Sequence, residues 1–222
     1  MKNFKLKLTG MALSILLLSC TATNKPLQLK DGDLLFQGTS STKLSEAIDK
    51  VTQTGAETHF SHVGLVELDE KGQVFVLHAA PDSGTCRVSL TDFLEPEGDS
   101  IKTVVYRLKE PWQKTVPKAL AKAHTMLGKP YNFSYVLSDS SHYCSEFIYK
   151  AFEADSVFRL NPMTFKDPSS GEFFPTWVDY YGRMGIAIPE GEPGCNPNGM
   201  AASDKLECLG VLEEQEVMGH EY

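Results

Sequence analysis

Short hydrophobic segments alternate with polar turns through the first two-thirds of the chain. Residues 34–36 (LLF) follow an Asp-Gly-Asp turn, and residues 61–68, 73–80 and 103–108 are rich in valine, leucine and aromatic residues. The DEKG sequence between the second and third runs is typical of a turn. The pattern therefore predicts four short strands, with residues 61–68 and 73–80 paired as an antiparallel hairpin.

Apolar residues spaced three or four apart predict three helices. The first begins at residues 40–42, which can cap it, and ends at Gly55. The second covers residues 116–127, and the third covers residues 143–154 with Ser141 as its N-cap. A strand-rich middle packed against a few helices indicates an α+β fold, with an antiparallel sheet, rather than an alternating parallel-sheet domain.

Residues 155–222 show no long periodic pattern. They are rich in proline, glycine and aromatic residues, which predicts long loops with short helices. Five aromatic residues here could roof a cleft or could be ordinary packing: Phe173, Phe174, Trp177, Tyr180 and Tyr181.

The N-terminus has the form of a secretory signal. Three lysines within the first seven residues precede an apolar run at residues 11–18, which is too short to span a bilayer. Ser19 and Cys20 follow, and a small residue directly before cysteine resembles the lipobox of bacterial lipoproteins. In those proteins the cysteine sulfur is diacylated and holds the chain on a membrane without any spanning segment.

We therefore expect a signal peptide at residues 1–19, a lipidated Cys20 with a tether through residue 30, and one folded domain at residues 31–222. Within it, residues 31–154 carry the motifs and residues 155–222 form the loop-rich part. The expected location is the bacterial cell envelope, at the outer membrane or periplasm, with the membrane as a partner through the lipid anchor.

The charge of the chain argues against nucleic acid as a partner. The 222 residues have a formal net charge of −8, and removing the first nineteen leaves 18 basic against 29 acidic residues. An acidic surface repels phosphate backbones, and no run of lysine and arginine offsets it.

Export to an oxidising compartment bears on the remaining cysteines, Cys86, Cys144, Cys195 and Cys208. Cys195 and Cys208 flank a loop rich in glycine, proline and asparagine, and the spacing is compatible with a disulfide that closes it. Cys86 fits the role of a small buried hydrophobic residue.

Cys144 is the candidate nucleophile. With Ser141 as N-cap it falls at the third helical position, where unpaired N–H groups and the helix dipole favour a thiolate. The same N–H groups could stabilise an oxyanion on a substrate carbonyl. Position alone favours a buried structural thiol, which is the more common role of a lone cysteine on an apolar helix face, so a base and an orienting group are required.

His62 and His78 supply the best candidates for the base and its partner. If paired residue numbers in the hairpin sum to 142, Gly64 faces His78 and the two histidines become diagonal neighbours on one face. A slip of one residue would separate them. The other histidines fit worse: His124 suits a rim position, His142 points away from the thiol, His220 is near the end of the chain, and His59 has only a turn-like His-x-x-His spacing with His62.

Three motifs in this order resemble the YiiX-like hydrolases, a circularly permuted branch of the NlpC-type papain-like superfamily: Asp31 to Phe36 (DGDLLF), Ser61 to Val66 (SHVGLV) and Tyr143 to Phe147 (YCSEF). The resemblance covers residues 31–154. It implies a permuted papain-like fold with the catalytic cysteine at a helix N-terminus, and a histidine that precedes the cysteine in the chain.

Carried onto this sequence, the resemblance implies Cys144 as nucleophile, His62 as base and His78 as the third residue. Many members of the family have glutamate at the third position, so His78 is a departure, although a neutral imidazole can also fix the tautomer of the base. Tyr131 matches an aromatic residue at the cleft wall, and it joins Gly64 as a candidate substrate-binding residue. No cofactor is expected.

The activity that the resemblance implies is amide hydrolysis through an acyl-enzyme, on peptidoglycan fragments or other short peptides. Permuted relatives of the lecithin:retinol acyltransferase type, which have a second histidine, keep lipid acyl transfer or ester hydrolysis open. A non-catalytic lipoprotein that binds peptides or amino acids is a third reading. A zinc site from His59, His62, His78 and Cys86 ranks lowest, because no CxxC or HExxH spacing supports it.

Overall fold

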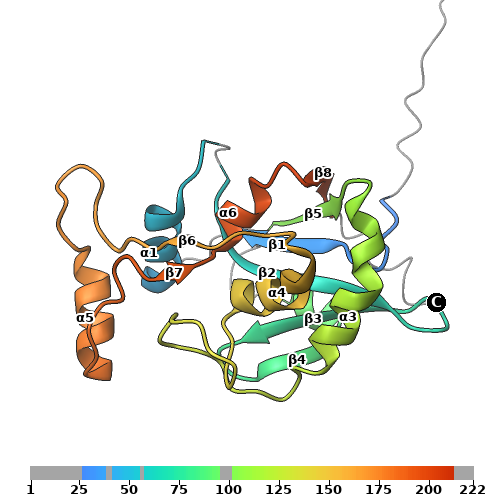
Figure 1. Ribbon diagram of the computed structural model, residues 1–222, viewed down its shortest axis with the longest axis horizontal. Helices are drawn as coiled ribbons and strands as arrows, with labels where there is room; N and C mark the ends of the chain where they lie inside the picture. The colour runs from blue at the N-terminus through green and yellow to red at the C-terminus, as the bar shows by residue number, and fades with distance from the viewer. Residues whose placement is uncertain (1–26, 39–41, 56–57, 96–101, 213–222) are drawn as a thin grey trace, which may run out of the picture.

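The strand-like segments form one six-stranded antiparallel sheet in the computed structural model, which describes residues 27–38, 42–55, 58–95 and 102–212. The strand order is β4-β3-β2-β1-β5-β8 (Figure 1). The strands are β1 (Leu34–Gly38), β2 (Phe60–Leu68), β3 (Val74–Ala80), β4 (Gly84–Ser89), β5 (Thr103–Leu108) and β8 (Leu206–Val211). The four predicted strands are confirmed.

The two strands that the sequence pattern missed, β4 and β8, lie at the edges of the sheet. β4 pairs with β3 from Phe75↔Ser89 to Ala80↔Gly84, and β8 pairs with β5. Edge strands bury less of their surface, so their sequences, GTCRVS and LECLGV, are short of the hydrophobic residues that mark a strand.

The predicted helices are also confirmed, as α1 (Lys43–Thr52), α3 (Val116–His124) and α4 (Cys144–Phe152). The Thr42 hydroxyl caps α1 by accepting from the Ser45 N–H at 3.1 Å. The expected cap of α4 was wrong: Tyr143 is its N-cap, so Cys144 is the first helical residue rather than the third. The remaining elements are α2 (Leu90–Leu94), α5 (Pro175–Met184), α6 (Pro197–Ala201), the 3₁₀ turns η1 (Trp112–Thr115) and η2 (Glu153–Asp155), and the short pair β6 (Asn161–Pro162) and β7 (Pro193–Gly194).

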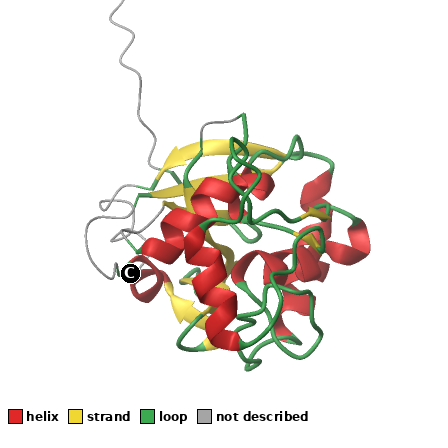
Figure 2. Ribbon diagram, turned by 90° about the vertical axis from the view of Figure 1, so that its left-hand side faces the viewer, coloured by secondary structure: helices red, strands yellow, loops and turns green. Residues whose placement is uncertain are grey.

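Alternate residues of the central strands serve two hydrophobic cores. Leu34 and Phe36 face the main core with Phe147 and Ile148 of α4, whereas Leu35 faces a second core on the other side of the sheet. Helices α3 and α4 cover the main core, and Figure 2 shows helices and loops lying in front of the strands. This two-faced burial gives the α+β architecture that the pattern predicted.

The Asp-Gly-Asp turn before β1 has a structural role. The Asp31 carboxylate accepts from the Leu68 N–H at 2.7 Å, and buried Asp33 forms a 2.6 Å ion pair with Arg107 of β5. Gly32 has a φ of 83°, and a Cβ at this position would lie 2.3 Å from a methyl group of Val116. Only glycine therefore lets α3 pack this closely on the turn.

The expected disulfide between Cys195 and Cys208 was wrong, because both are free thiols. Helix α6 and β8 occupy the intervening chain, so Cys195 is buried beneath Tyr143 while Cys208 is exposed opposite Tyr106. Cys86 is also free and is partly exposed, with its sulfur 3.3 Å from the Ser83 hydroxyl.

A third, aromatic core joins α5 to α1. Trp177 and Tyr181 of α5 are buried with Phe165 and with Ala47 of α1. The Tyr181 hydroxyl donates to the Ser134 carbonyl at 3.1 Å, which ties α5 to the segment before α4. The expected signal peptide and Cys20 lie outside the described residues, and none of the helices described is long and apolar enough to cross a membrane.

Candidate active site

The β2–β3 hairpin brings His62 and His78 together. Its ladder runs from Leu65↔Leu77 to Leu68↔Val74, so paired numbers sum to 142 as the sequence analysis required. His62 Nε2 lies 2.9 Å from His78 Nδ1, and the two rings meet edge to face at 5.2 Å between centroids. If His62 Nε2 carries the proton and donates it to His78, His62 Nδ1 is left as an acceptor.

Phe93 of α2 supports both imidazoles. Its ring centroid lies 5.7 Å from that of His62 and 5.2 Å from that of His78. A Cβ on Gly64 would lie 2.4 Å from Val76 and 2.8 Å from the Phe93 ring. Gly64 therefore makes room for the ring that packs on the histidines, and it does not line the cavity described below.

Cys144 begins α4 and rests against the strand that carries His62. Its side chain is buried, and the sulfur lies 4.0 Å from the Ser61 carbonyl oxygen. Backbone N–H groups of Ser145 and Val63 face the sulfur. Ser61 and Val63 flank His62, so the sulfur lies against the part of β2 that carries the base, before the paired stretch of the hairpin.

Burial governs the protonation of all three groups. It raises the pKa of the Cys144 thiol to about 11, against the opposing effect of the N–H donors. Burial and the neighbouring His78 lower the pKa of His62 to about 3, and burial lowers the pKa of His78 to about 4. The resting site is a neutral thiol beside two neutral imidazoles, so the thiolate expected from the helix dipole is outweighed by desolvation.

A cavity of about 120 Å³ opens beside Cys144. No charged side chain lines it. The lining residues come from residues 48–61, near the start of the described chain, and from residues 131–197. The apolar part comes from α1, the β6 region and α5: Ile48, Val51, Pro162, Met163, Phe165 and Trp177. Trp177 thus joins the wall, as one reading of the C-terminal aromatic residues allowed.

Tyr131 and Tyr135 form the wall next to the nucleophile. Burial raises the pKa of Tyr131 well above 10, and the Cys144 N–H faces its phenol oxygen. Tyr135 has a φ of 57°, a conformation that side-chain-bearing residues seldom adopt, and its ring packs 5.4 Å from Tyr143. The segment that carries both tyrosines is thus held in one particular shape.

A second, more polar cavity of about 420 Å³ adjoins the first across Asn161, Cys195 and Asn196. Arg159 and Lys205 line it together with a single acidic residue, Asp204. The site thus has an apolar compartment at the thiol and a cationic compartment beyond it.

The other candidate ligands lie apart from the site. His59 pairs with Asp49 at 2.9 Å, and His124 pairs with Glu67 at 2.5 Å. His142 is buried beside Glu146. Within the ranges that the structure describes, no three His, Cys, Asp or Glu side chains are grouped so that they could hold a metal ion.

Sequence reasoning missed Phe93, Tyr135 and Cys195 as parts of the site. No local signal marks Phe93 or Cys195, because tertiary packing alone brings them to it. Glu146 had a signal, since glutamate three residues after an N-cap indicates a capping box.

A helix-start cysteine on an antiparallel sheet, preceded in the chain by its histidines, defines a cysteine hydrolase of the permuted papain-like class. The chain belongs to the permuted papain-like amidase family, YaeF/YiiX, C92, whose model matches residues 28–210. This confirms the family that the three motifs indicated.

Two relatives agree with this membership. The chain is 30% identical over 127 residues to the uncharacterized protein YiiX of Escherichia coli K12, and the match covers 57% of this chain. It spans 58% of the length of that relative. The crystal structure of the metalloprotein YiiX from Escherichia coli O157:H7 is similar with a TM-score of 0.66 at 25% identity, over 82% of this chain and 97% of that one.

Proposed function

We propose that the protein hydrolyses amide bonds of short peptides or peptide-like substrates, with Cys144 as nucleophile, His62 as base and His78 as orienting residue. The observation that carries the proposal is the 2.9 Å contact between His62 and His78, beside a thiol that rests on the strand carrying His62. Together they supply a nucleophile, a base and a group that fixes the base's tautomer.

The protonation states suggest how the first step proceeds. A thiol with a pKa of about 11 does not give its proton to an imidazole with a pKa of about 3 in advance of the reaction. His62 therefore takes the thiol proton while the sulfur attacks the substrate carbonyl. This step leaves a positive charge on the imidazolium and a negative charge on the former carbonyl oxygen. The imidazolium then protonates the leaving amine, and a water activated by His62 releases the acyl group from Cys144.

Tyr131 is suited to stabilise the oxyanion. Its phenol already contacts the Cys144 N–H, so a substrate oxygen bound there would meet two donors, one phenolic and one from the backbone. The high pKa of Tyr131 keeps the phenol protonated and therefore able to donate.

The two cavities suggest the kind of substrate. The uncharged compartment at Cys144 favours an apolar side chain or acyl group next to the scissile bond. The compartment with Arg159 and Lys205 favours a carboxylate farther along the substrate. Cell-wall peptide fragments with a free carboxylate combine both features, provided that an apolar residue lies at the cleaved bond.

A lipid acyl substrate is the second candidate. The apolar wall formed by Met163, Phe165 and Trp177 would also suit a fatty acyl chain, and two histidines in place of a histidine and a carboxylate match the lipid-acting relatives. Both substrate classes agree with attachment to the cell envelope through Cys20, which we propose from the sequence of residues 1–20.

The test is turnover of a substrate panel by protein that begins after Cys20. The panel contains muropeptides, short peptides with apolar or charged residues at the cleaved bond, and phospholipids. We expect peptide cleavage that is lost in Cys144→Ala and retained in Cys208→Ala, the matched exposed cysteine. Release of fatty acid with no peptide cleavage would favour the lipid candidate, and turnover that survives Cys144→Ala would refute the mechanism.

A further inference from the structure

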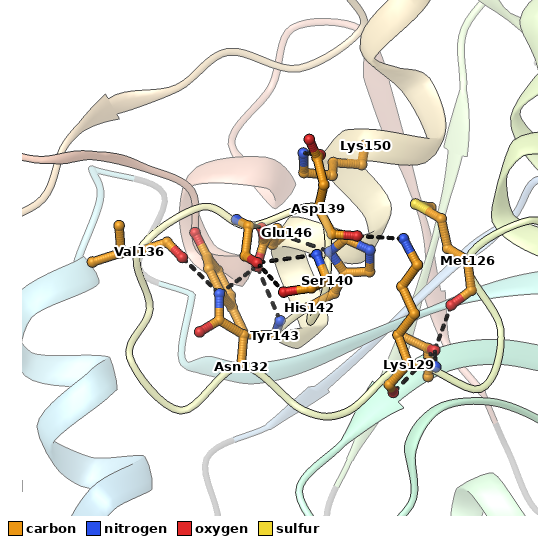
Figure 3. Close-up of polar contacts among 12 residues, drawn as sticks. Met126, Lys129, Asn132, Val136, Asp139, Ser140, His142, Tyr143, Glu146 and Lys150 are labelled. Atoms are coloured by element: carbon orange, nitrogen blue, oxygen red, sulfur yellow. Dashed lines mark hydrogen bonds and ion pairs between the residues drawn. The ribbon is translucent and has the colours of Figure 1, made fainter. Parts of the chain in front are cut away.

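A fully buried carboxylate lies two residues after the nucleophile. Glu146 is 0% exposed and accepts three hydrogen bonds: from the Ser138 N–H at 2.6 Å, the Asn132 amide at 3.0 Å and the Tyr143 N–H at 3.3 Å. His142 Nδ1 lies 3.6 Å from the same carboxylate. Figure 3 shows Glu146 between Asn132 on one side and Tyr143 with His142 on the other.

These donors come from two segments that both reach the active site. Tyr143 directly precedes Cys144, and Asn132 directly follows Tyr131. Asn132 extends the network, because it also donates to the Val136 carbonyl at 2.7 Å and accepts from the Ser134 hydroxyl at 2.8 Å. One carboxylate thus connects the start of α4 to the whole tyrosine segment, residues 131–138.

Packing alone does not require a carboxylate at this position, whereas hydrogen bonding to the surrounding N–H groups does. The three groups hydrogen-bonded to Glu146 are all N–H donors, and the oxygens of a carboxylate accept. Burying a charge is costly, and an apolar residue of similar size commonly gives equal or greater stability. What the carboxylate adds is direction, because three N–H groups from two segments must point to one place.

We propose that Glu146 is a positioning residue, which holds the Tyr131 phenol and the Cys144 thiol in register for oxyanion stabilisation. The proposal rests on the proposed function, since it assigns Glu146 a role in that reaction. It extends the assignment to a residue that contacts neither the substrate cavity nor the reacting sulfur.

Glu146→Gln tests the proposal with little change in shape. The glutamine amide has two hydrogens in place of one acceptor oxygen. Because the groups bonded to Glu146 are themselves donors, one of the two segments must move away from the side chain. Misplacement of reacting groups by about 1 Å can cost about 100-fold in rate, so we expect kcat to fall about 10-fold to 100-fold, with a smaller change in KM. Lys150→Gln on the same helix, which removes the ion pair with exposed Asp139 and leaves the hydrogen bonds of Glu146 in place, is the matched control and should keep wild-type kcat.

A double-mutant cycle separates positioning from folding. If Glu146 acts through Tyr131, Tyr131→Phe should lower kcat strongly in the wild type and little in Glu146→Gln. Asn132→Ala removes one of the two links from Glu146 to the tyrosine segment, together with the Asn132 bonds to Val136 and Ser134, and serves if Glu146→Gln does not fold. It should reproduce the kcat loss and the non-additivity with Tyr131→Phe.

Unchanged kcat in either folded variant, or full additivity with Tyr131→Phe, would overturn the positioning role while leaving the proposed function intact. Turnover that persists in Cys144→Ala would instead refute the proposed function. Iodoacetamide alkylation of Cys144 in each variant gives a readout that needs no substrate. A changed rate constant in Glu146→Gln and Asn132→Ala, but not in Lys150→Gln, supports the proposal.

Discussion

Two buried neutral imidazoles should make the folded protein sensitive to acid. The perturbation is a fall in pH from about 8 to about 5. An unfolded histidine with the ordinary pKa of 6.5 takes up its proton in this range, whereas folded His62 and His78, with pKa values of about 3 and about 4, do not. Because the folded pKa values lie below the unfolded value, stability is complete above pH 6.5 and decreases as the pH falls.

The magnitude follows from the distance between pH 5 and the unfolded pKa. Each pH unit below that value is worth about 1.4 kcal/mol, so each imidazole removes about 2 kcal/mol and the pair removes about 4 kcal/mol at pH 5. Unfolding by urea at a series of pH values measures this as a fall in the free energy of unfolding. The double variant His62→Gln/His78→Gln keeps every other titratable group and should lose this part of the pH dependence.

The comparison of slopes is decisive because the exposed histidines and the carboxylates contribute equally to both proteins. A wild type and a double variant with the same change in unfolding free energy between pH 8 and pH 5 would refute the reasoning. In that case the imidazoles would be as accessible to protons in the folded state as in the unfolded one.

Three further predictions follow from the site. In Gly64→Ala, the new methyl group meets Val76 and the Phe93 ring. We expect a loss of about 1–3 kcal/mol in unfolding free energy together with reduced kcat, and calorimetry that finds wild-type stability would contradict the packing role. In His78→Glu, a carboxylate beside His62 should raise the pKa of that imidazole, so the acid limb of the kcat/KM profile should move up toward neutral pH; an unmoved limb would argue against contact between the two side chains. Iodoacetamide should label buried Cys144 more slowly than exposed Cys208 at neutral pH, and faster labelling of Cys144, read by mass spectrometry, would indicate a resting thiolate.

The hairpin could be predicted from its two strand-like runs and the turn between them, whereas the register that sums to 142 was a condition, because residues on both faces of β2 and β3 are buried: Leu65 and Leu77 on one, Val66 and Val76 on the other. In that register His62 and His78 lie on one face of the sheet, because side chains alternate between the two faces along a strand. These two members of the candidate site could therefore be predicted from the sequence. Helices α1, α3 and α4 were recognisable for the same kind of reason, since each buries one stripe.

Other parts of the site depend on contacts between distant segments and had no local pattern. The Ser141 cap was a wrong choice because Tyr143 and Glu146 form a capping box that starts the helix two residues later. The disulfide was wrong because α6 and β8 occupy what the composition suggested was an open loop. The protonation state of Cys144 could not be predicted either, since helix position is visible in the sequence and depth of burial is not.

The absence of charge around the cavity at Cys144 bears on how salt affects turnover. The nucleophile, its base and the orienting residue are all neutral at rest, and no charged side chain lines that cavity. Mobile ions screen interactions between charges over about 10 Å at 0.1 M salt, so they have little to screen at the reacting centre. Ionic strength should therefore leave kcat nearly constant, and its effect on KM should appear only for substrates whose anionic end reaches Arg159 and Lys205.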